Sequence, residues 1–198
     1  MPKTKPSVFI IESLRFKDER SGHMEGQILQ QILHLSGKEA EYVYIRTAKE
    51  LEEVLDQYYE SNFRYLHISC HGNDREIALT LDTLKFPKFG ELVDPILKNR
   101  RLFVSACSVV NKAFAAAVIP SSECQSIVGP GKDILFGDAA MMWAAFYHLV
   151  FKTNADAMNL QAIRSALEKT RTAFGIPFKY FSKSESSPAG YKEHSIGV

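Results

Sequence analysis

The sequence lacks the features that would assign it to a membrane, secreted or nucleic-acid-binding class. Its most apolar run, AAMMWAAFYHLVF, covers only about two-thirds of a membrane-spanning length. The first residues, MPKTKPSVFIIES, do not follow the charged and then apolar pattern of a secretory signal. A formal net charge of +1 provides no general attraction for nucleic acid or an anionic membrane surface. We therefore expect a cytoplasmic protein that binds neither.

Cysteine is scarce as well. Three cysteines, an odd number without a secretory signal, argue against a disulfide framework, so each thiol is either a core residue or a catalytic one. The doublet Cys70-His71 lacks the paired C-x-x-C spacing of a structural zinc site. The segment GPGKD at Gly129 does not have the full pattern of a phosphate-binding loop. We expect no metal site and no cofactor.

What is present is the composition of an ordinary soluble globular protein, with 45% hydrophobic and 24% charged residues. The 198 residues are enough for one domain with a full core. We expect this domain to span residues 1–182, followed by a flexible tail over 183–198 that contains the polar stretch SKSESSPAG.

The first half of the chain alternates strand and helix. Short apolar or β-branched runs predict strands at 7–11, 41–45 and 65–69. Between them, leucines and isoleucines at helical spacing predict a helix that ends near Gly37, and the capping box Thr47-x-x-Glu50 predicts the start of another. Residues 12–22 form a charged loop. This β-α-β-α-β order indicates an α/β fold with a mostly parallel sheet and helices on both faces.

The second half is less regular. The predicted elements are a small hairpin over 77–86, a short helix within 87–97, strands at 101–106 and 126–128, and helices at 111–118, 138–151 and 157–174. Asp138 is placed to cap the helix over 138–151. Between 119 and 126, a proline, two serines and an acidic residue indicate an exposed loop open to proteolysis.

Two reactive side chains follow two of these strands. FRYLHISCHG ends with His71, and RRLFVSACS ends with Cys107. Loops at the carboxyl ends of strands in an open α/β sheet meet in one crevice, so these residues are expected to face each other there. An imidazole beside a thiol is a nucleophile with its base.

The motifs CHG and SAC, on successive strands of an α/β chain, resemble the His-Gly and Ala-Cys signatures of caspase-like cysteine proteases. The resemblance is greatest to the CHAT group, the caspase-HetF-associated proteases related to separases. The later IVGP, GDAA and AAFY segments resemble that group's third motif block. The resemblance covers about residues 63–151 and implies a caspase-like three-layer sandwich.

The family resemblance implies roles for four residues. Cys107 is the nucleophile, His71 is its acid and base, and the backbone N–H groups of Gly72 and Cys107 stabilise the oxyanion. An arginine in the loop after the first strand, Arg15 or Arg20, would bind an acidic substrate side chain, and we favour Arg15. Relatives that cut after Arg or Lys often have an Asp two residues before the nucleophile, where this chain has Ser105. Acidic or small polar substrates are therefore favoured over basic ones.

The expected function is thus a cysteine endopeptidase that cleaves protein substrates and is controlled by an activating partner, a small signalling ligand or formation of a homo-oligomer. The alternative is a catalytically silent binding or scaffold module on the same fold. On that alternative, His71 is an ordinary loop histidine and Cys107 a small buried hydrophobic residue. In both cases we expect Cys70 to be a packing residue and His67 an interior histidine with its hydrogen bonds satisfied.

Overall fold

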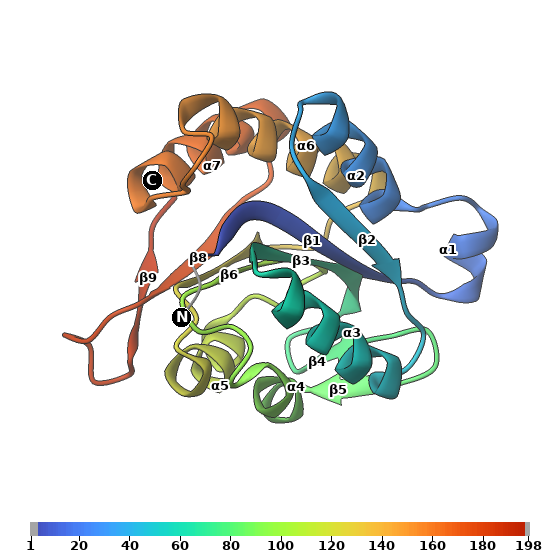
Figure 1. Cartoon of the computed structure of the whole chain (residues 1–198), viewed down its shortest axis with the longest axis horizontal. Helices are drawn as coiled ribbons and strands as arrows, with labels where there is room; N and C mark the ends of the chain where they lie inside the picture. Colours follow the sequence, from blue (N-terminus) through green and yellow to red (C-terminus); the bar gives the residue numbers. More distant parts are fainter. Residues whose placement is uncertain (1–3, 197–198) are drawn as a thin grey trace.

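The computed structural model describes residues 4–196 and forms a three-layer α/β structure (Figure 1). In chain order the elements are β1 (Lys5–Ser13), α1 (Phe16–Arg20), α2 (Glu25–Leu35), β2 (Ala40–Tyr44), α3 (Ala48–Ser61), β3 (Phe63–Gly72), β4 (Glu76–Ala78), β5 (Thr83–Lys85), α4 (Phe86–Val93), β6 (Arg101–Ser105), α5 (Lys112–Ser122), β7 (Ser126–Pro130), α6 (Phe136–Thr153), α7 (Leu160–Phe174), β8 (Phe178–Lys183) and β9 (Tyr191–His194).

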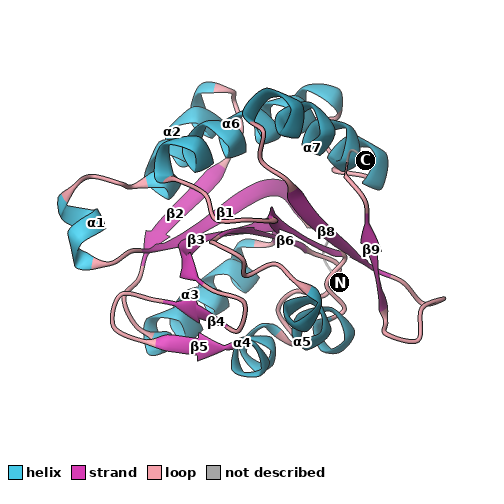
Figure 2. Ribbon diagram, turned by 180° about the vertical axis from the view of Figure 1, so that it is seen from behind, coloured by secondary structure: helices cyan, strands magenta, loops and turns pink. Residues whose placement is uncertain are grey.

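The sheet has the strand order β2-β1-β3-β6-β7-β8-β9. The first five strands in this order run parallel, and β8 and β9 pair antiparallel at one edge. Figure 2 shows α2, α6 and α7 covering one face of the sheet and α3, α4 and α5 covering the other. The predicted α/β fold with a mostly parallel sheet is confirmed.

Local sequence signals explain where several helices begin and end. The hydroxyl of Thr47 accepts a hydrogen bond from the Glu50 N–H, and the Glu50 carboxylate accepts one from the Thr47 N–H, as the capping box predicts. Gly175 adopts φ 66° at the end of α7, a left-handed conformation that glycine adopts at low cost. The predicted cap at Asp138 is wrong, because α6 begins at Phe136 and Asp138 lies inside its first turn.

Two predicted loops contain ordered secondary structure instead: the loop over 12–22 includes the end of β1 and helix α1, and the loop over 119–126 includes the end of α5. The predicted exposed loop over 119–126 is wrong, because α5 continues through Pro120 to Ser122. The Ser122 hydroxyl bonds to the Val118 carbonyl, and the side chains of Ile119, Ser122 and Cys124 are buried. A helix tolerates a proline here because the buried side chains hold its last turn against the core.

Part of the tail expected over 183–198 is a strand in the structure. Tyr191–His194 forms the edge strand β9 and pairs with β8. The Tyr191 ring packs edge-on against Phe181, with a centroid separation of 5.8 Å. Residues 197 and 198 of the predicted tail lie outside the described residues.

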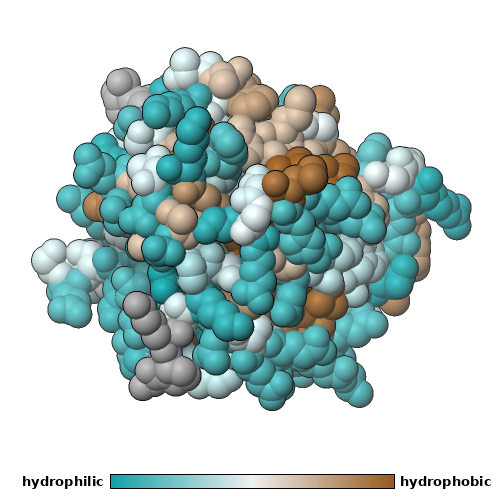
Figure 3. All heavy atoms as spheres, turned by 45° about the horizontal axis from the view of Figure 1, so that its top comes forward, coloured by the Kyte–Doolittle hydropathy of each residue, from teal (hydrophilic) through white to brown (hydrophobic). Residues whose placement is uncertain are grey.

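Among the described residues, no helix is both long enough and apolar enough to cross a membrane. The face seen in Figure 3 is mostly hydrophilic, and its hydrophobic residues form separate patches. Exposed apolar side chains include Phe16 and Leu135, which lie on segments that approach the carboxyl edge of the parallel strands.

Candidate active site

The register of two central strands brings His71 and Cys107 to the same edge of the sheet. In the parallel pairing of β3 with β6, Ser69 lies opposite Ser105. His71 follows two residues later within β3, and Cys107 follows two residues later in the turn after β6. Adjacent strands lie about 4.8 Å apart, so this register brings the backbones of the two residues to the same end of neighbouring strands.

The neighbouring glycine shows how closely the two strand ends approach each other. A Cβ atom added to Gly72 would lie 3.8 Å from the Ala106 Cβ and only 2.3 Å from the Val109 Cγ2. Any larger residue would therefore clash with the chain that follows Cys107. Glycine is therefore needed here for packing of the two motifs.

His71 lies within strand β3 and not in a loop after it. β3 continues through Gly72, and His71 pairs with Ala78 of the short strand β4. The turn itself begins at Asn73, whose side chain accepts hydrogen bonds from the Arg75 and Glu76 N–H groups. A histidine held in a paired strand has a fixed backbone, which limits its ring to a few orientations.

Asp18 is a candidate site residue that sequence reasoning missed. Its Oδ2 atom lies 2.9 Å from the His71 Nε2, and its Oδ1 lies 3.6 Å from the His23 Nδ1. Burial alone would raise the pKa of the Asp18 carboxyl, but the hydrogen bond and charge of His71 outweigh it and lower the pKa below its ordinary value. A carboxylate only accepts hydrogen bonds, so Nε2 carries the hydrogen and Nδ1 of the neutral ring remains free to accept a proton.

An apolar segment connects the histidine side of the site to the cysteine side. The Phe136 ring packs edge-on against His71, with centroids 5.5 Å apart, and stacks on His23 at 4.8 Å. Two residues earlier, the Ile134 carbonyl lies 3.9 Å from the Cys107 Sγ. The loop before α6 therefore contacts both proposed reactive residues.

The turn after Cys107 has an unusual backbone. Ser108 adopts φ 57°, a left-handed conformation that costs free energy for a residue with a side chain. Its hydroxyl bonds to Asp133 at 3.0 Å, and its carbonyl accepts a bond from the Asn111 side chain at 3.2 Å. Asn111 also caps α5 by accepting from the Phe114 N–H. These contacts hold Cys107 on a sharp strand-to-helix turn, and no feature of the sequence had indicated the strain.

The three cysteines occupy different environments. Cys107 is partly exposed, whereas Cys70 and Cys124 are buried. Burial raises the pKa of the Cys70 thiol well above its ordinary value and that of Cys124 to about 12. Cys70 also belongs to the apolar core on the face opposite His71, which agrees with its predicted packing role.

A polar cluster lies below the candidate dyad on the same face of the sheet. It contains Glu12, Ser69 and Ser105 at the strand ends, His67 one level deeper, and Glu25 at the start of α2. All five residues are buried. The His67 Nδ1 lies 3.1 Å from the Tyr147 hydroxyl, but its Nε2 has no hydrogen-bond partner, so the expectation of a fully satisfied histidine is wrong.

The predicted substrate-binding residue Arg15 stands at the start of α1 and is exposed. Its backbone carbonyl accepts hydrogen bonds from the Asp18 and Glu19 N–H groups. Within residues 4–196, no ion pair of its guanidinium is present. A role of Arg15 in binding substrate therefore stays a prediction.

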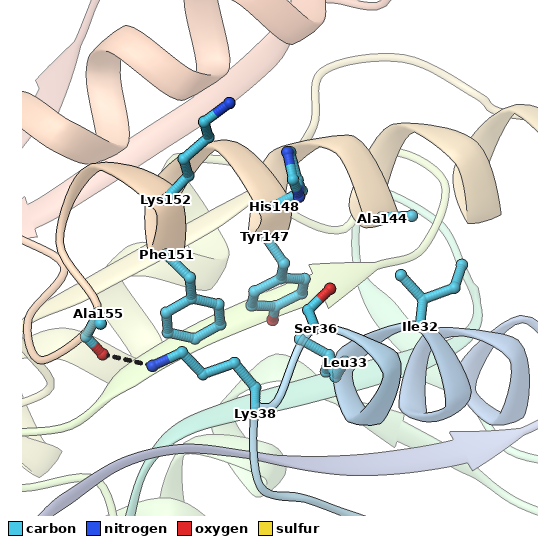
Figure 4. Close-up of a pocket in the computed structure, with 10 residues that line it drawn as sticks. All are labelled: Ile32, Leu33, Ser36, Lys38, Ala144, Tyr147, His148, Phe151, Lys152 and Ala155. Carbon is cyan, nitrogen blue, oxygen red and sulfur yellow. Dashed lines mark hydrogen bonds between the residues drawn. The ribbon is translucent and has the colours of Figure 1, made fainter.

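Two hollows lie outside the dyad. One, of about 660 Å³, is lined by the turn that follows Gly72, including Asn73 and Glu76, and by Phe86 and Pro87 of α4. The other, of about 330 Å³, lies between α2 and α6 on the outer surface (Figure 4). In this second hollow the Lys38 ammonium lies over the Phe151 ring and donates a hydrogen bond of 2.7 Å to the Ala155 carbonyl. Over the described part of the chain, no group of three His, Cys, Asp or Glu side chains is arranged to hold a metal ion.

The fold is caspase-like. The structure is similar to caspase-1 from Spodoptera frugiperda, with a TM-score of 0.56 and 12% sequence identity over 98% of this chain and 86% of that one. It is also similar to protein GSU0716 from Geobacter sulfurreducens, with a TM-score of 0.52 and 10% identity over 98% of this chain and 99% of that one. No family model and no curated protein sequence matches this chain. These similarities establish the fold, and the reaction has to be argued from the site.

Proposed function

We propose that this chain is a cysteine endopeptidase of the CHAT group, in which Cys107 is the nucleophile and His71 its acid and base. The observation that carries the proposal is the bond between Asp18 and the His71 Nε2, on the sheet edge where a partly exposed cysteine follows a neighbouring strand. Nucleophile, base and a third group that orients the base are the parts that this chemistry needs.

The reaction begins when Cys107 transfers its proton to His71 and the sulfur attacks a peptide carbonyl carbon. The carbonyl oxygen becomes an oxyanion, which we assign to the backbone N–H groups of Gly72 and Cys107. The intermediate then collapses, the C–N bond breaks, and His71 gives its proton to the leaving amine. A thioester joins Cys107 to the acyl part of the substrate. Water, deprotonated by His71, hydrolyses this ester and restores the thiol.

Asp18 is a positioning residue in this scheme. By accepting the Nε2 hydrogen it holds His71 in the tautomer whose Nδ1 accepts the thiol proton, and its charge stabilises the imidazolium that forms. It lies on α1, a helix of five residues between β1 and α2. Segment 14–24, which contains α1, is the part of the chain whose position controls whether His71 is oriented.

This dependence suggests how activity is controlled. An activating protein partner, a small signalling ligand or homo-oligomer formation would act by stabilising segment 14–24 with Asp18 on His71. The second control loop expected from the sequence, over 119–126, has no support, because its first part is the last turn of α5. Control is therefore proposed for segment 14–24 alone.

The experiment is to incubate the purified chain with a peptide library prepared from whole-cell protein and to identify new termini by mass spectrometry. We expect cleavage by the wild type and none above background by Cys107→Ala or His71→Ala. His148→Ala is the matched control, because His148 is an exposed histidine on α6 away from the dyad, and it should cleave like the wild type. Cleavage that survives in Cys107→Ala would assign the nucleophile elsewhere, and no cleavage by any form, with or without cell extract as activator, would favour the silent scaffold.

A further inference from the structure

Helix α1 carries Asp18 but has no buried apolar side chain of its own. Among its five residues only Asp18 is buried, and Phe16, its one large apolar residue, is 49% exposed. A helix this short is not stable by itself, so contacts with the rest of the chain must hold it in place. Since hydrophobic burial does not supply these contacts, the polar contacts of α1 decide whether Asp18 stays against His71.

The polar contacts of α1 outside the candidate dyad come from Glu19, the residue after Asp18. Its Oε1 accepts a hydrogen bond from the hydroxyl of Tyr44, the last residue of β2. The Arg46 Nη2 lies 3.1 Å from the Glu19 Oε1 and 3.2 Å from its Oε2. The bond from Tyr44 and the charge of Arg46 lower the pKa of the Glu19 carboxyl below its ordinary value, so this group is a carboxylate at neutral pH.

The Tyr44 hydroxyl contacts the chain both before α1 and within it. It accepts a hydrogen bond of 3.1 Å from the Leu14 N–H. Its single hydrogen goes to Glu19, because the carboxylate is the stronger acceptor and the Leu14 carbonyl already accepts from the Thr80 hydroxyl at 2.6 Å. One hydroxyl group therefore links the start of segment 14–24 to the helix inside it.

The partners of Glu19 have fixed positions. Tyr44 lies in β2, which pairs in parallel with β1. The Arg46 N–H donates to the Glu50 carboxylate at 2.6 Å, and its carbonyl accepts from the Leu81 N–H at 2.9 Å. The Arg46 guanidinium also lies over the Tyr44 ring, 5.0 Å from the ring centroid. Glu19 thus ties α1 to an ordered part of the chain.

The two acidic residues of α1 connect two different strands. In the sheet β1 lies between β2 and β3. Glu19 bonds to Tyr44 at the end of β2, and Asp18 bonds to His71 near the end of β3. Successive side chains of a helix point about 100° apart, so a single placement of α1 satisfies both carboxylates. Loss of the Glu19 contacts would leave Asp18 on a helix without a fixed position.

We propose that Glu19 and Tyr44 are positioning residues, which hold α1 where Asp18 accepts the hydrogen of the His71 Nε2. This inference rests on the proposed endopeptidase function and identifies the contacts on which the control by segment 14–24 depends. Both residues act through Asp18. Arg46 contributes less, because its side chain is 46% exposed and exposed ion pairs add little to stability.

The kinetic test compares single and double variants. Glu19→Ala is expected to lower kcat by about 5- to 50-fold with little change in KM, and to alter the kinetic pH profile as Asp18→Asn does. Because Glu19 acts through Asp18, Glu19→Ala combined with Asp18→Asn should be no slower than Asp18→Asn alone, within about twofold. Tyr44→Phe, which removes one oxygen atom, should reproduce the effect and serves as the test if Glu19→Ala does not fold. Glu41→Ala, at an exposed glutamate on β2, is the matched control and should keep the wild-type kcat.

A measurement without catalysis separates this inference from the proposed reaction. In the Cys107→Ala protein, the nitrogen NMR shifts of the neutral His71 ring report which ring nitrogen carries the hydrogen. We expect the Nε2–H tautomer in this protein and when Glu41→Ala is added. With Glu19→Ala or Tyr44→Phe added, the ring should become a mixture of the two tautomers, because no acceptor is held at Nε2.

Release of α1 can be followed by limited trypsin digestion of the same proteins, because Arg15, Lys17 and Arg20 lie in or beside the helix. Glu19→Ala should raise the rate of cutting there by about tenfold or more, since proteolysis follows the population of the open segment.

Two results would overturn the inference and leave the endopeptidase intact. One is a Glu19→Ala protein with unchanged trypsin cutting and an unchanged His71 tautomer. The other is a loss of kcat that multiplies with that of Asp18→Asn. A released α1 and a changed tautomer, in a protein that cleaves no peptide in any form, would overturn the proposed reaction and leave the positioning contacts.

Discussion

The two faces of the central sheet differ in the polarity of their buried side chains. On β3, Leu66, Ile68 and Cys70 point into an apolar core beneath α3, α4 and α5. The residues between them, His67 and Ser69, point to the other face and lead up to His71. The same alternation on β6 separates the core residues Leu102 and Val104 from Phe103 and Ser105.

The two faces differ in composition, although helices cover both. The face toward α3, α4 and α5 contains only apolar side chains on β3 and β6 and provides stability. The other face is apolar at its lower end, where Tyr65 and Phe103 pack on α6, and becomes polar toward the carboxyl ends of the strands. Buried polar residues on one face of a covered sheet are costly for packing alone, and their position supports the proposed placement of the site at this end of the strands.

The largest effect should come from two cysteines, one at the candidate site and one in the apolar core. Cys107→Ala is expected to lower cleavage by about 1,000-fold or more, because it removes the nucleophile, with little change in stability. Cys70→Ala should retain activity per folded molecule and lose about 1 kcal/mol of stability, because it leaves a small cavity in the apolar core. Peptidase assays and urea unfolding of both variants measure the two effects, and equal loss of activity in both would contradict the division of the faces.

Truncation of a buried side chain on the apolar face should destabilise the protein, as it does in a hydrophobic core. Leu66→Ala is expected to lower the free energy of unfolding by about 2–5 kcal/mol, since Leu66 is completely buried. Denaturant unfolding gives the value. A loss below about 1 kcal/mol would mean that the face is loosely packed and that stability resides elsewhere.

On the polar face, removal of the Glu12 charge should stabilise the protein, whereas truncation of Leu66 on the apolar face should destabilise it. The folded-state pKa of Glu12, about 7, lies above the ordinary value of 4.5, so the folded chain binds the proton more tightly than the unfolded chain. The free energy of unfolding is therefore expected to fall by up to about 3 kcal/mol as pH rises from about 4.5 to 7, and to stay level above that range. Glu12→Gln should abolish this slope and stabilise the protein at pH 8. Melting temperatures across this pH range are the measurement, and a Gln variant less stable than the wild type at pH 8 would show that the carboxylate is satisfied.

A smaller effect is expected at Asp18. Asp18→Asn should lower kcat by about 10- to 100-fold with little change in KM, because the amide no longer fixes the His71 tautomer. Since the folded-state pKa of Asp18 is lowered, its contribution to stability is present above its ordinary pKa near 3.8 and is lost as pH falls below that value. A kinetic pH profile that is identical in wild type and Asp18→Asn would exclude a role for Asp18 in orienting the base.

Much of the fold could be predicted from local patterns in the sequence. The capping box at Thr47, the apolar strand runs and the hairpin over 77–86 all have the predicted structure, because each depends on residues close together in the chain. The α5 extension through Pro120 and the β9 strand could not be predicted, because tertiary packing and strand pairing override polar or helix-breaking composition there.

Some residues of the candidate site could also be predicted from the sequence, and others could not. His71 and Cys107 could be identified because each ends a recognisable strand. Asp18 and Glu19 could not, because both lie in a charged segment where any acidic residue would normally be assigned to solvent. Their proposed roles depend on where α1 folds back against β2 and β3, which is information that residue spacing does not contain.

The most direct test of the account is the rate at which each cysteine of the folded protein is alkylated by iodoacetamide, followed by mass spectrometry of the labelled peptides. We expect Cys107 to react faster than Cys70 and Cys124, because it is partly exposed and His71 is proposed to act as its base, while the other two are buried. His71→Ala should slow the reaction at Cys107 and leave the other two rates unchanged. If Cys107 reacts no faster than the buried thiols, or if its rate does not depend on His71, these residues do not form a catalytic dyad.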